Sequence, residues 1–162
     1  MKNQLIALAG AMMLTACASG SGSAPIQPLP QALRTGARVV SVNVDNIPER
    51  GVSAEFGQVF QTRVQTALNE CATGQQPLTL EISLDTFDRA NAAMTWLISD
   101  QNSIAGIARL KDSSGNLVGE YLIRRVFTAG GLVGIALMSQ AEEQMSDAFG
   151  EELCKQAFGA GS

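Results

Sequence analysis

The distribution of apolar and polar residues predicts the strands of this chain. Residues 38–45 alternate, with Val40, Val42 and Val44 on one face and polar side chains between them, which is typical of a half-buried strand. A stricter alternation predicts a second strand over residues 78–85, whose packed face is formed by Leu78, Leu80, Ile82 and Leu84.

Two further strands are predicted over residues 104–111 and 117–127. Asp112–Asn116 separates them and contains a glycine, so it is expected to form a hairpin turn. Residues 86–101 fit either an extension of the second strand or a loop that folds onto the sheet.

Apolar residues spaced three and four apart predict two amphipathic helices. The first runs from Phe56 to Cys71, with Ser53 as a plausible N-cap. The second runs from Leu132 to about Ala157.

The element order is therefore β-α-β-β-β-α, which predicts an α+β two-layer sandwich. Because a helix joins the first two strands, they are expected to be parallel, while the last three form an antiparallel meander. The result is a four-stranded mixed sheet with two parallel helices on one face.

The chain begins with a lysine, then an apolar run, and then Leu14-Thr15-Ala16-Cys17. A charged start followed by a short apolar run is typical of a secretory signal and is too short to span a bilayer. The four residues resemble the lipobox of bacterial lipoproteins. The resemblance implies cleavage after Ala16, lipid on Cys17 and, because residue 18 is alanine, an outer-membrane location facing the periplasm. The alternative is an ordinary secreted protein with a chance cysteine.

These features divide the chain into four parts. Residues 1–16 are the predicted signal peptide, and residues 17–36, which are small, polar and proline-bearing, a lipidated flexible tether. Residues 37–158 form a single α/β domain, and residues 159–162 a disordered tail.

Once the signal is removed, ten basic residues face 15 acidic ones, a net charge of −5, and the chain contains no histidine. Such an acidic chain is not expected to bind nucleic acid. The absence of histidine removes the commonest general base and the commonest metal ligand. We therefore expect no enzyme activity, no metal and no cofactor.

Cysteine usage predicts one disulfide. In the oxidising periplasm Cys71 and Cys154 remain as a pair once Cys17 carries lipid, and two free buried thiols are the alternative. The predicted topology independently places both cysteines at the same end of the two parallel helices.

Three groups of residues were weighed as sites. Asp85, Asp88 and Arg89 fit a cation or polar-ligand site, but a solvated strand end with a surface ion pair is favoured. Arg124 and Arg125 fit an anion site or a charged edge strand. The glycine-rich segment 129–138 is either buried against the sheet or an exposed interaction patch formed by Leu132, Val133, Ile135 and Met138.

In signal, tether and element order the chain is similar to small envelope lipoproteins such as the YajG-type lipoproteins, and to the auxiliary lipoproteins of lipid-transporting ABC systems. The first hypothesis is a non-enzymatic binding or scaffold module that faces the periplasm, held on the membrane by its lipid, with an envelope protein as partner. The alternatives are a lipid-handling accessory of an envelope transport system and, third, a hydrolase. The sequence leaves the oligomeric state open.

Overall fold

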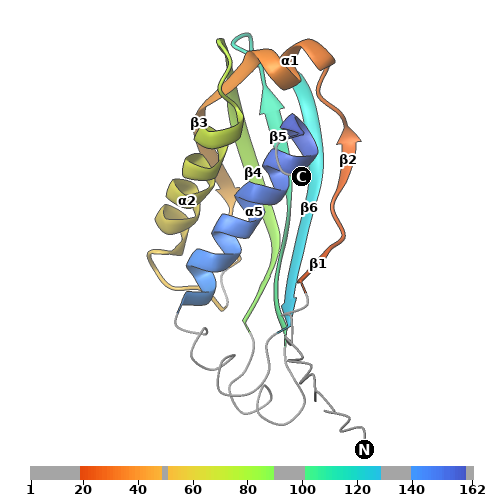
Figure 1. The fold of residues 1–162 in the computed structure, drawn as a ribbon. Coiled ribbons are helices and arrows are strands. Elements are labelled where there is room, and N and C mark those ends of the chain that lie inside the picture. The colour runs from red at the N-terminus through yellow and green to blue at the C-terminus, as the bar shows by residue number, and fades with distance from the viewer. Residues whose placement is uncertain (1–18, 49–50, 90–100, 129–139, 160–162) are drawn as a thin grey trace, which may run out of the picture.

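The computed structural model describes residues 19–48, 51–89, 101–128 and 140–159. Within them one mixed β-sheet carries two long helices on one face (Figure 1). In chain order the elements are β1 (Ser19–Ser21), β2 (Ala24–Gln27), α1 (Gln31–Gly36), β3 (Ala37–Asn46), α2 (Phe56–Cys71), β4 (Gln76–Asp88), β5 (Gln101–Lys111), β6 (Leu117–Thr128) and α5 (Ala141–Phe158).

The sheet contains six strands in the order β1-β6-β5-β4-β3, and β2 also pairs with β6, so β1 and β2 share one edge position. β3 and β4 are parallel, and every other pair is antiparallel. The α+β class, the parallel first pair and the meander agree with the sequence-based prediction. The predicted number of four strands is wrong, because β1 and β2 precede the first strand that the pattern revealed.

The N-terminal segment also differs from the prediction, which treated residues 17–36 as a flexible tether. From Ser19 onward it is part of the fold, since β1 and β2 both pair with β6. Leu29 is buried, and its N–H donates a 2.7 Å hydrogen bond to the phenol oxygen of Tyr121. Strand pairing uses backbone groups, so small polar side chains can join a sheet edge without an apolar pattern.

β3 is bulged, which changes the faces that the alternation predicted. The pairing with β4 skips Val40, so Val39 is buried while Val40 is 51% exposed. Beyond the bulge Val42 is buried, as predicted. The prediction for Val40 is therefore wrong, because one extra residue reverses the alternation of a strand.

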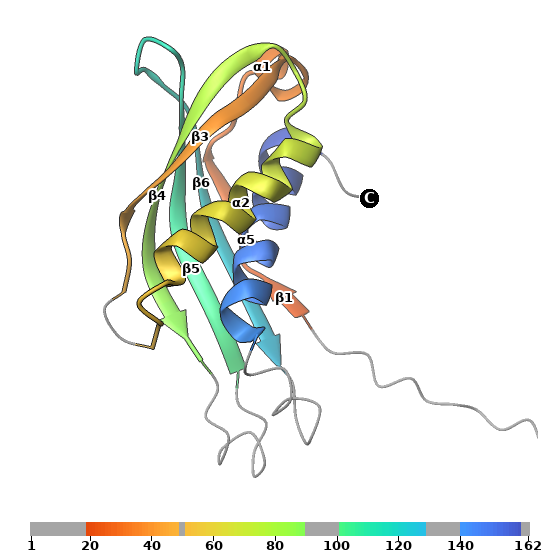
Figure 2. The same ribbon diagram turned by 90° about the vertical axis from the view of Figure 1, so that its left-hand side faces the viewer.

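α2 and α5 lie side by side and parallel across one face of the sheet, as Figures 1 and 2 both show. The two helices run in the same direction, because contacts between them occur in the same order along both. Arg63 near the middle of α2 pairs with Glu143 and Asp147 early in α5, and Cys71 at the end of α2 bonds Cys154 near the end of α5. The predicted parallel arrangement and the predicted disulfide are both present.

The core lies between this helix pair and the sheet. Leu78, Leu80, Ile82 and Leu84 of β4 are all buried, as predicted. The helices contribute three phenylalanine rings to the core. The ring centroids of Phe56 and Phe60 are 5.7 Å apart, and those of Phe60 and Phe149 are 5.2 Å apart.

The start of α2 differs in detail from the prediction. The helix begins at Phe56, so Ser53 is not its N-cap. Instead the backbone N–H and the hydroxyl of Ser53 donate to the carboxylate of Glu142. The residue thereby links the entry of α2 to the start of α5.

Candidate functional site

The chain enters the fold at one end of the sheet. Ser19 opens β1 opposite Phe127 near the end of β6, and Gln101 opens β5 opposite Thr128. β4 also ends here, and α5 begins here (Figure 1). The start of β1 therefore lies at the same end as four other element ends, and the hairpin between β5 and β6 lies at the opposite end.

Glu152 of α5 holds the N-terminal strand in place. Its carboxylate accepts a 2.7 Å hydrogen bond from the hydroxyl of Ser21 in β1 and a 2.9 Å bond from the amide of Gln156. Its other oxygen pairs with the guanidinium of Arg125 in β6 at 3.2 Å. The Glu152 side chain is only 4% exposed, so this is a nearly buried charge with a full set of partners.

These partners decide the ionisation of Glu152. Burial alone would raise its pKa, but the hydrogen bonds from Gln156 and Ser21, together with the charge of Arg125, outweigh burial and hold the pKa below its ordinary value. The carboxylate therefore stays ionised at neutral pH, as its role of acceptor for β1 requires.

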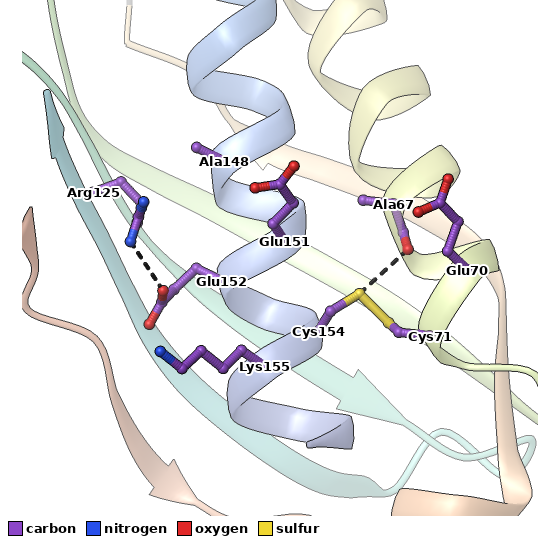
Figure 3. Close-up of a pocket in the computed structure, with 9 residues that line it drawn as sticks. All are labelled: Ala67, Glu70, Cys71, Arg125, Ala148, Glu151, Glu152, Cys154 and Lys155. Atoms are coloured by element: carbon purple, nitrogen blue, oxygen red, sulfur yellow. Dashed lines mark hydrogen bonds and ion pairs between the residues drawn. A yellow bond between two sulfur atoms is a disulfide. The ribbon is translucent and has the colours of Figure 1, made fainter. Parts of the chain in front are cut away.

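A pocket of about 520 Å³ surrounds this part of α5 (Figure 3). Figure 3 shows the Arg125–Glu152 pair on one flank of α5 and the Cys71–Cys154 disulfide on the other. The charged groups of the lining therefore do not converge on one point. The residues that line the pocket are Ala67, Glu70, Cys71, Arg125, Ala148, Glu151, Glu152, Cys154 and Lys155.

The disulfide joins α2 to α5 near the C-terminal ends of both helices. The Cα atoms of Cys71 and Cys154 are 5.9 Å apart, and the Sγ of Cys154 lies 3.3 Å from the carbonyl oxygen of Ala67. A disulfide sulfur carries no proton, so this is a packing contact rather than a hydrogen bond. The bridge serves as a structural cross-link between the helices.

The contacts in this region are structural rather than reactive. Within the described ranges no group of three or more metal-ligating side chains comes together. The two sulfurs are joined, and Glu152 is engaged by three partners. The arrangement is suited to fixing β1 against β6 and α5.

The predicted cluster at the end of β4 is divided between two contacts. Asp88 is exposed and accepts a long 3.5 Å hydrogen bond from Ser103 of β5. Arg89 pairs at 3.4 Å with Glu142 of α5. These are the surface contacts of a solvated strand end, the alternative that the sequence analysis favoured.

The two arginines of β6 point to opposite faces. Arg124 is exposed, whereas Arg125 lies on the helix side, with its guanidinium 5.5 Å from the centre of the Phe127 ring. The sequence predicts an anion site or a charged edge strand for these two arginines and does not identify the partner of Arg125. Glu152 was missed because helix periodicity marks it only as one polar residue among buried neighbours.

Several predicted residues lie outside the described ranges: Ala16 and Cys17 of the predicted lipobox, and Leu132, Val133, Ile135 and Met138 of the predicted interaction patch. Within the described ranges no helix combines the length and apolar character that a bilayer crossing needs.

Comparison with known proteins supports the fold. No family model and no curated protein matches the chain. Among solved structures, PelC from Paraburkholderia phytofirmans, a dodecamer, is similar in two crystal forms with a TM-score of 0.50 and 13% and 11% identity. The match covers 86% of this chain and 98% or 99% of PelC.

Two further structures are similar at lower scores. One is XCC0632 from Xanthomonas campestris (TM-score 0.48, 13% identity, 80% of this chain and 91% of that one). The other is a candidate lipoprotein from Caulobacter crescentus (TM-score 0.46, 16% identity, 70% and 84%). At these identities the likeness to PelC concerns the fold alone, and the two lower scores carry no argument.

Proposed function

We propose that this chain is a lipoprotein anchored through Cys17 to the periplasmic side of the outer membrane, where it acts as a non-enzymatic binding or scaffold module. The observation that carries the proposal is the position of β1. Ser19 is already paired with β6, and it follows the lipobox cysteine by two residues. Two residues span at most about 7 Å, so lipid on Cys17 would hold the domain directly at the bilayer.

The same geometry supports an orientation in which the end of the sheet where β1 starts faces the membrane. The chain leaves β4 and β6 at the end where β1 starts, and it re-enters at β5 and α5. The connecting sequences 90–100 and 129–139 contain one charged residue between them, Asp100. We propose that Leu132, Val133, Ile135 and Met138 contact the bilayer surface beside the anchor.

A scaffold is supported over the lipid-handling alternative by the packing of the described residues. The space between the helices and the sheet is filled by apolar side chains, and the pocket beside α5 is lined by five charged residues. An acyl chain needs an apolar cavity. The similarity to PelC, which forms a dodecamer, also supports a module that works in an assembly.

Intact mass of the full chain isolated from bacterial membranes tests the anchor. We expect a mass that starts at Cys17 and includes acyl chains. The variant Cys17→Ala should lose the acyl mass and leave the membrane fraction, and Ala18→Asp should move the acylated protein to the inner membrane. An unacylated wild-type chain contradicts the anchor.

The orientation can be measured by lipid-borne quenchers. A fluorophore is attached to the full chain through Asp88→Cys at the end of β4, or through Ser114→Cys in the distant hairpin, both exposed positions. Nitroxide lipids should quench the label at residue 88 strongly and the label at residue 114 weakly. Equal quenching would mean that the domain has no fixed orientation.

A further inference from the structure

The N-terminal segment, residues 19–28, is attached to the fold differently from the chain that follows it. It runs along the outer edge of β6, away from α2 (Figure 1). No side chain of residues 21–28 is buried, and Ile26 is 56% exposed. These residues therefore contribute no side chain to the hydrophobic core, and their attachment depends on backbone pairing and a few polar contacts.

The backbone pairing of the N-terminal segment is short and interrupted. β1 and β2 contain three and four residues, and Gly22 and Ser23 separate them. Within β2 the register against β6 shifts between Pro25 and Gln27, and proline has no N–H to donate. Each interruption shortens the run of backbone bonds that must break together, so this edge of the sheet can open locally.

Two serine side chains add polar contacts to the pairing. The hydroxyl of Ser21 donates the 2.7 Å hydrogen bond to Glu152, and the hydroxyl oxygen of Ser23 accepts a 2.9 Å bond from the backbone N–H of Arg124. The acceptor of the first bond is ionised, and such bonds are roughly twice as strong as neutral ones. Of the two contacts, the bond to Glu152 is therefore the stronger.

The firm attachment of the chain begins at Leu29. Its side chain is 4% exposed, and its N–H donates to the hydroxyl of the buried Tyr121. A Cβ at Gly119 of β6 would lie 3.0 Å from the Cγ of Leu29, so this leucine packs directly on the backbone of β6. The residues before Leu29 can leave the sheet edge while Leu29 stays in the core.

The composition of the N-terminal segment suits both a docked and an undocked state. Residues 19–25 are serine, glycine, alanine and proline only, which is typical of flexible, well-hydrated linkers. Undocking transfers backbone groups of the segment to water and takes none of the side chains of residues 21–28 out of the core. Regions with few buried contacts open at free energies far below that of global unfolding. The docked and undocked states are therefore expected to differ little in free energy.

We propose that residues 19–28 form a releasable tether, which docks on β6 to hold the domain at the bilayer and undocks to let the domain move away while it stays anchored. The inference rests on the proposed lipid at Cys17. In the docked state the chain from Cys17 to Ser19 spans at most about 7 Å. In the undocked state the twelve residues from Cys17 to Leu29 span up to about 40 Å. The domain can then reach a partner deeper in the periplasm, and the contact between Ser21 and Glu152 sets how often it does.

Limited proteolysis tests for the undocked state. The acylated full chain in phospholipid vesicles is treated briefly with proteinase K, which cuts unpaired chain far faster than a paired strand. We expect a folded domain to leave the vesicles with a new N-terminus between residues 20 and 29, identified by intact mass. The rate of release reports the undocked population when docking is fast relative to cleavage. Release no faster than global unfolding overturns the proposal.

Variants at the contact between Ser21 and Glu152 test its role. Glu152→Gln and Ser21→Ala should each speed release roughly tenfold, since each removes the charge-assisted bond. Ser21 is exposed, so Ser21→Ala leaves the core packing intact. The matched control is Glu151→Gln, which removes a neighbouring charge on the side of α5 away from Arg125 and should not change the rate (Figure 3). Equal rates in all four proteins overturn the role of this contact.

Hydrogen exchange of the intact protein measures the same opening without a protease. Backbone amides of residues 19–28 should exchange on the order of a hundredfold faster than those of β4, at a rate that low concentrations of urea do not change. Protection equal to that of β4 in an acylated chain overturns the releasable tether and leaves the anchor intact. A chain without acyl mass instead contradicts the anchor, and with it the change in reach.

Discussion

Gly150 lies where α5 packs closely against Val64 and Ala67 of α2, and it permits a stringent test of the helix packing. A Cβ at this position would lie 2.8 Å from the Cβ of Ala67 and 3.3 Å from the Cα of Val64. Ordinary contacts between carbon atoms are 3.5–4.0 Å. Because Ala67 Cβ is fixed to a helix, the contact cannot be relieved by a side-chain rotation.

The expected effect of Gly150→Ala is the balance of two terms. Alanine is favoured over glycine within a helix by about 1 kcal/mol. Overpacking a tight interface costs typically 1–3 kcal/mol, and the disulfide one turn further along prevents the helices from separating there. We expect a net loss of about 1 kcal/mol in the free energy of unfolding, where an exposed glycine would show a gain.

Urea unfolding of the full chain, followed by circular dichroism, measures this loss. The matched partner is Ala67→Gly, which removes the opposing methyl group and alone should cost about 1 kcal/mol through helix propensity. In the double variant the clash is absent, so the double-mutant cycle should give a favourable coupling of at least ~1 kcal/mol. A stabilised Gly150→Ala, or strictly additive effects, would refute the close approach.

Three further predictions concern other contacts. Cys71 and Cys154 are separated by 83 residues, and replacing both by alanine should lower the free energy of unfolding by about 4 kcal/mol. A reductant should lower the free energy of unfolding of the wild type by the same amount and leave that of the variant unchanged. Glu152→Gln should lose stability near neutral pH relative to wild type; because the folded pKa lies below the ordinary 4.5, that difference should shrink as pH falls through the folded pKa, as pH-dependent unfolding would reveal. Tyr121→Phe leaves the buried N–H of Leu29 without its acceptor and should cost about 1–3 kcal/mol in urea unfolding.

Each of these has an outcome that contradicts its reasoning. A reductant that leaves the wild-type unfolding curve unchanged would mean that the bridge is absent in solution. A Glu152→Gln penalty that stays constant from pH 7 to pH 3 would mean that the carboxylate has no depressed pKa. An unchanged Tyr121→Phe variant would mean that the N-terminal segment does not dock on β6 through Leu29.

The parts of the fold that the sequence predicts are those with a regular apolar pattern. β4 was predicted because its alternation from Leu78 to Leu84 is unbroken, and α2 because its stripe from Phe56 to Cys71 keeps a helical period. The parallel helices followed from topology, and two cysteines at matching ends supplied a second line of reasoning.

The parts that were missed depend on contacts distant in sequence. The bulge at Val40 arises from the pairing with β4, and nothing in the pattern of β3 alone reveals it. β1 and β2 lack apolar periodicity because they join the sheet through backbone hydrogen bonds to β6. Glu152 acquires its role only when Ser21 and Arg125 converge on it.

The pairing of the first strands with β6 also sets an order of events in folding. Ser21 faces Arg125 in the finished sheet, so β1 has no partner strand until residues 117–128 are available to pair. The edge of the sheet that is first in the chain is therefore completed only after the strand that is last in the chain has been made, so folding of this edge cannot run ahead of synthesis of β6.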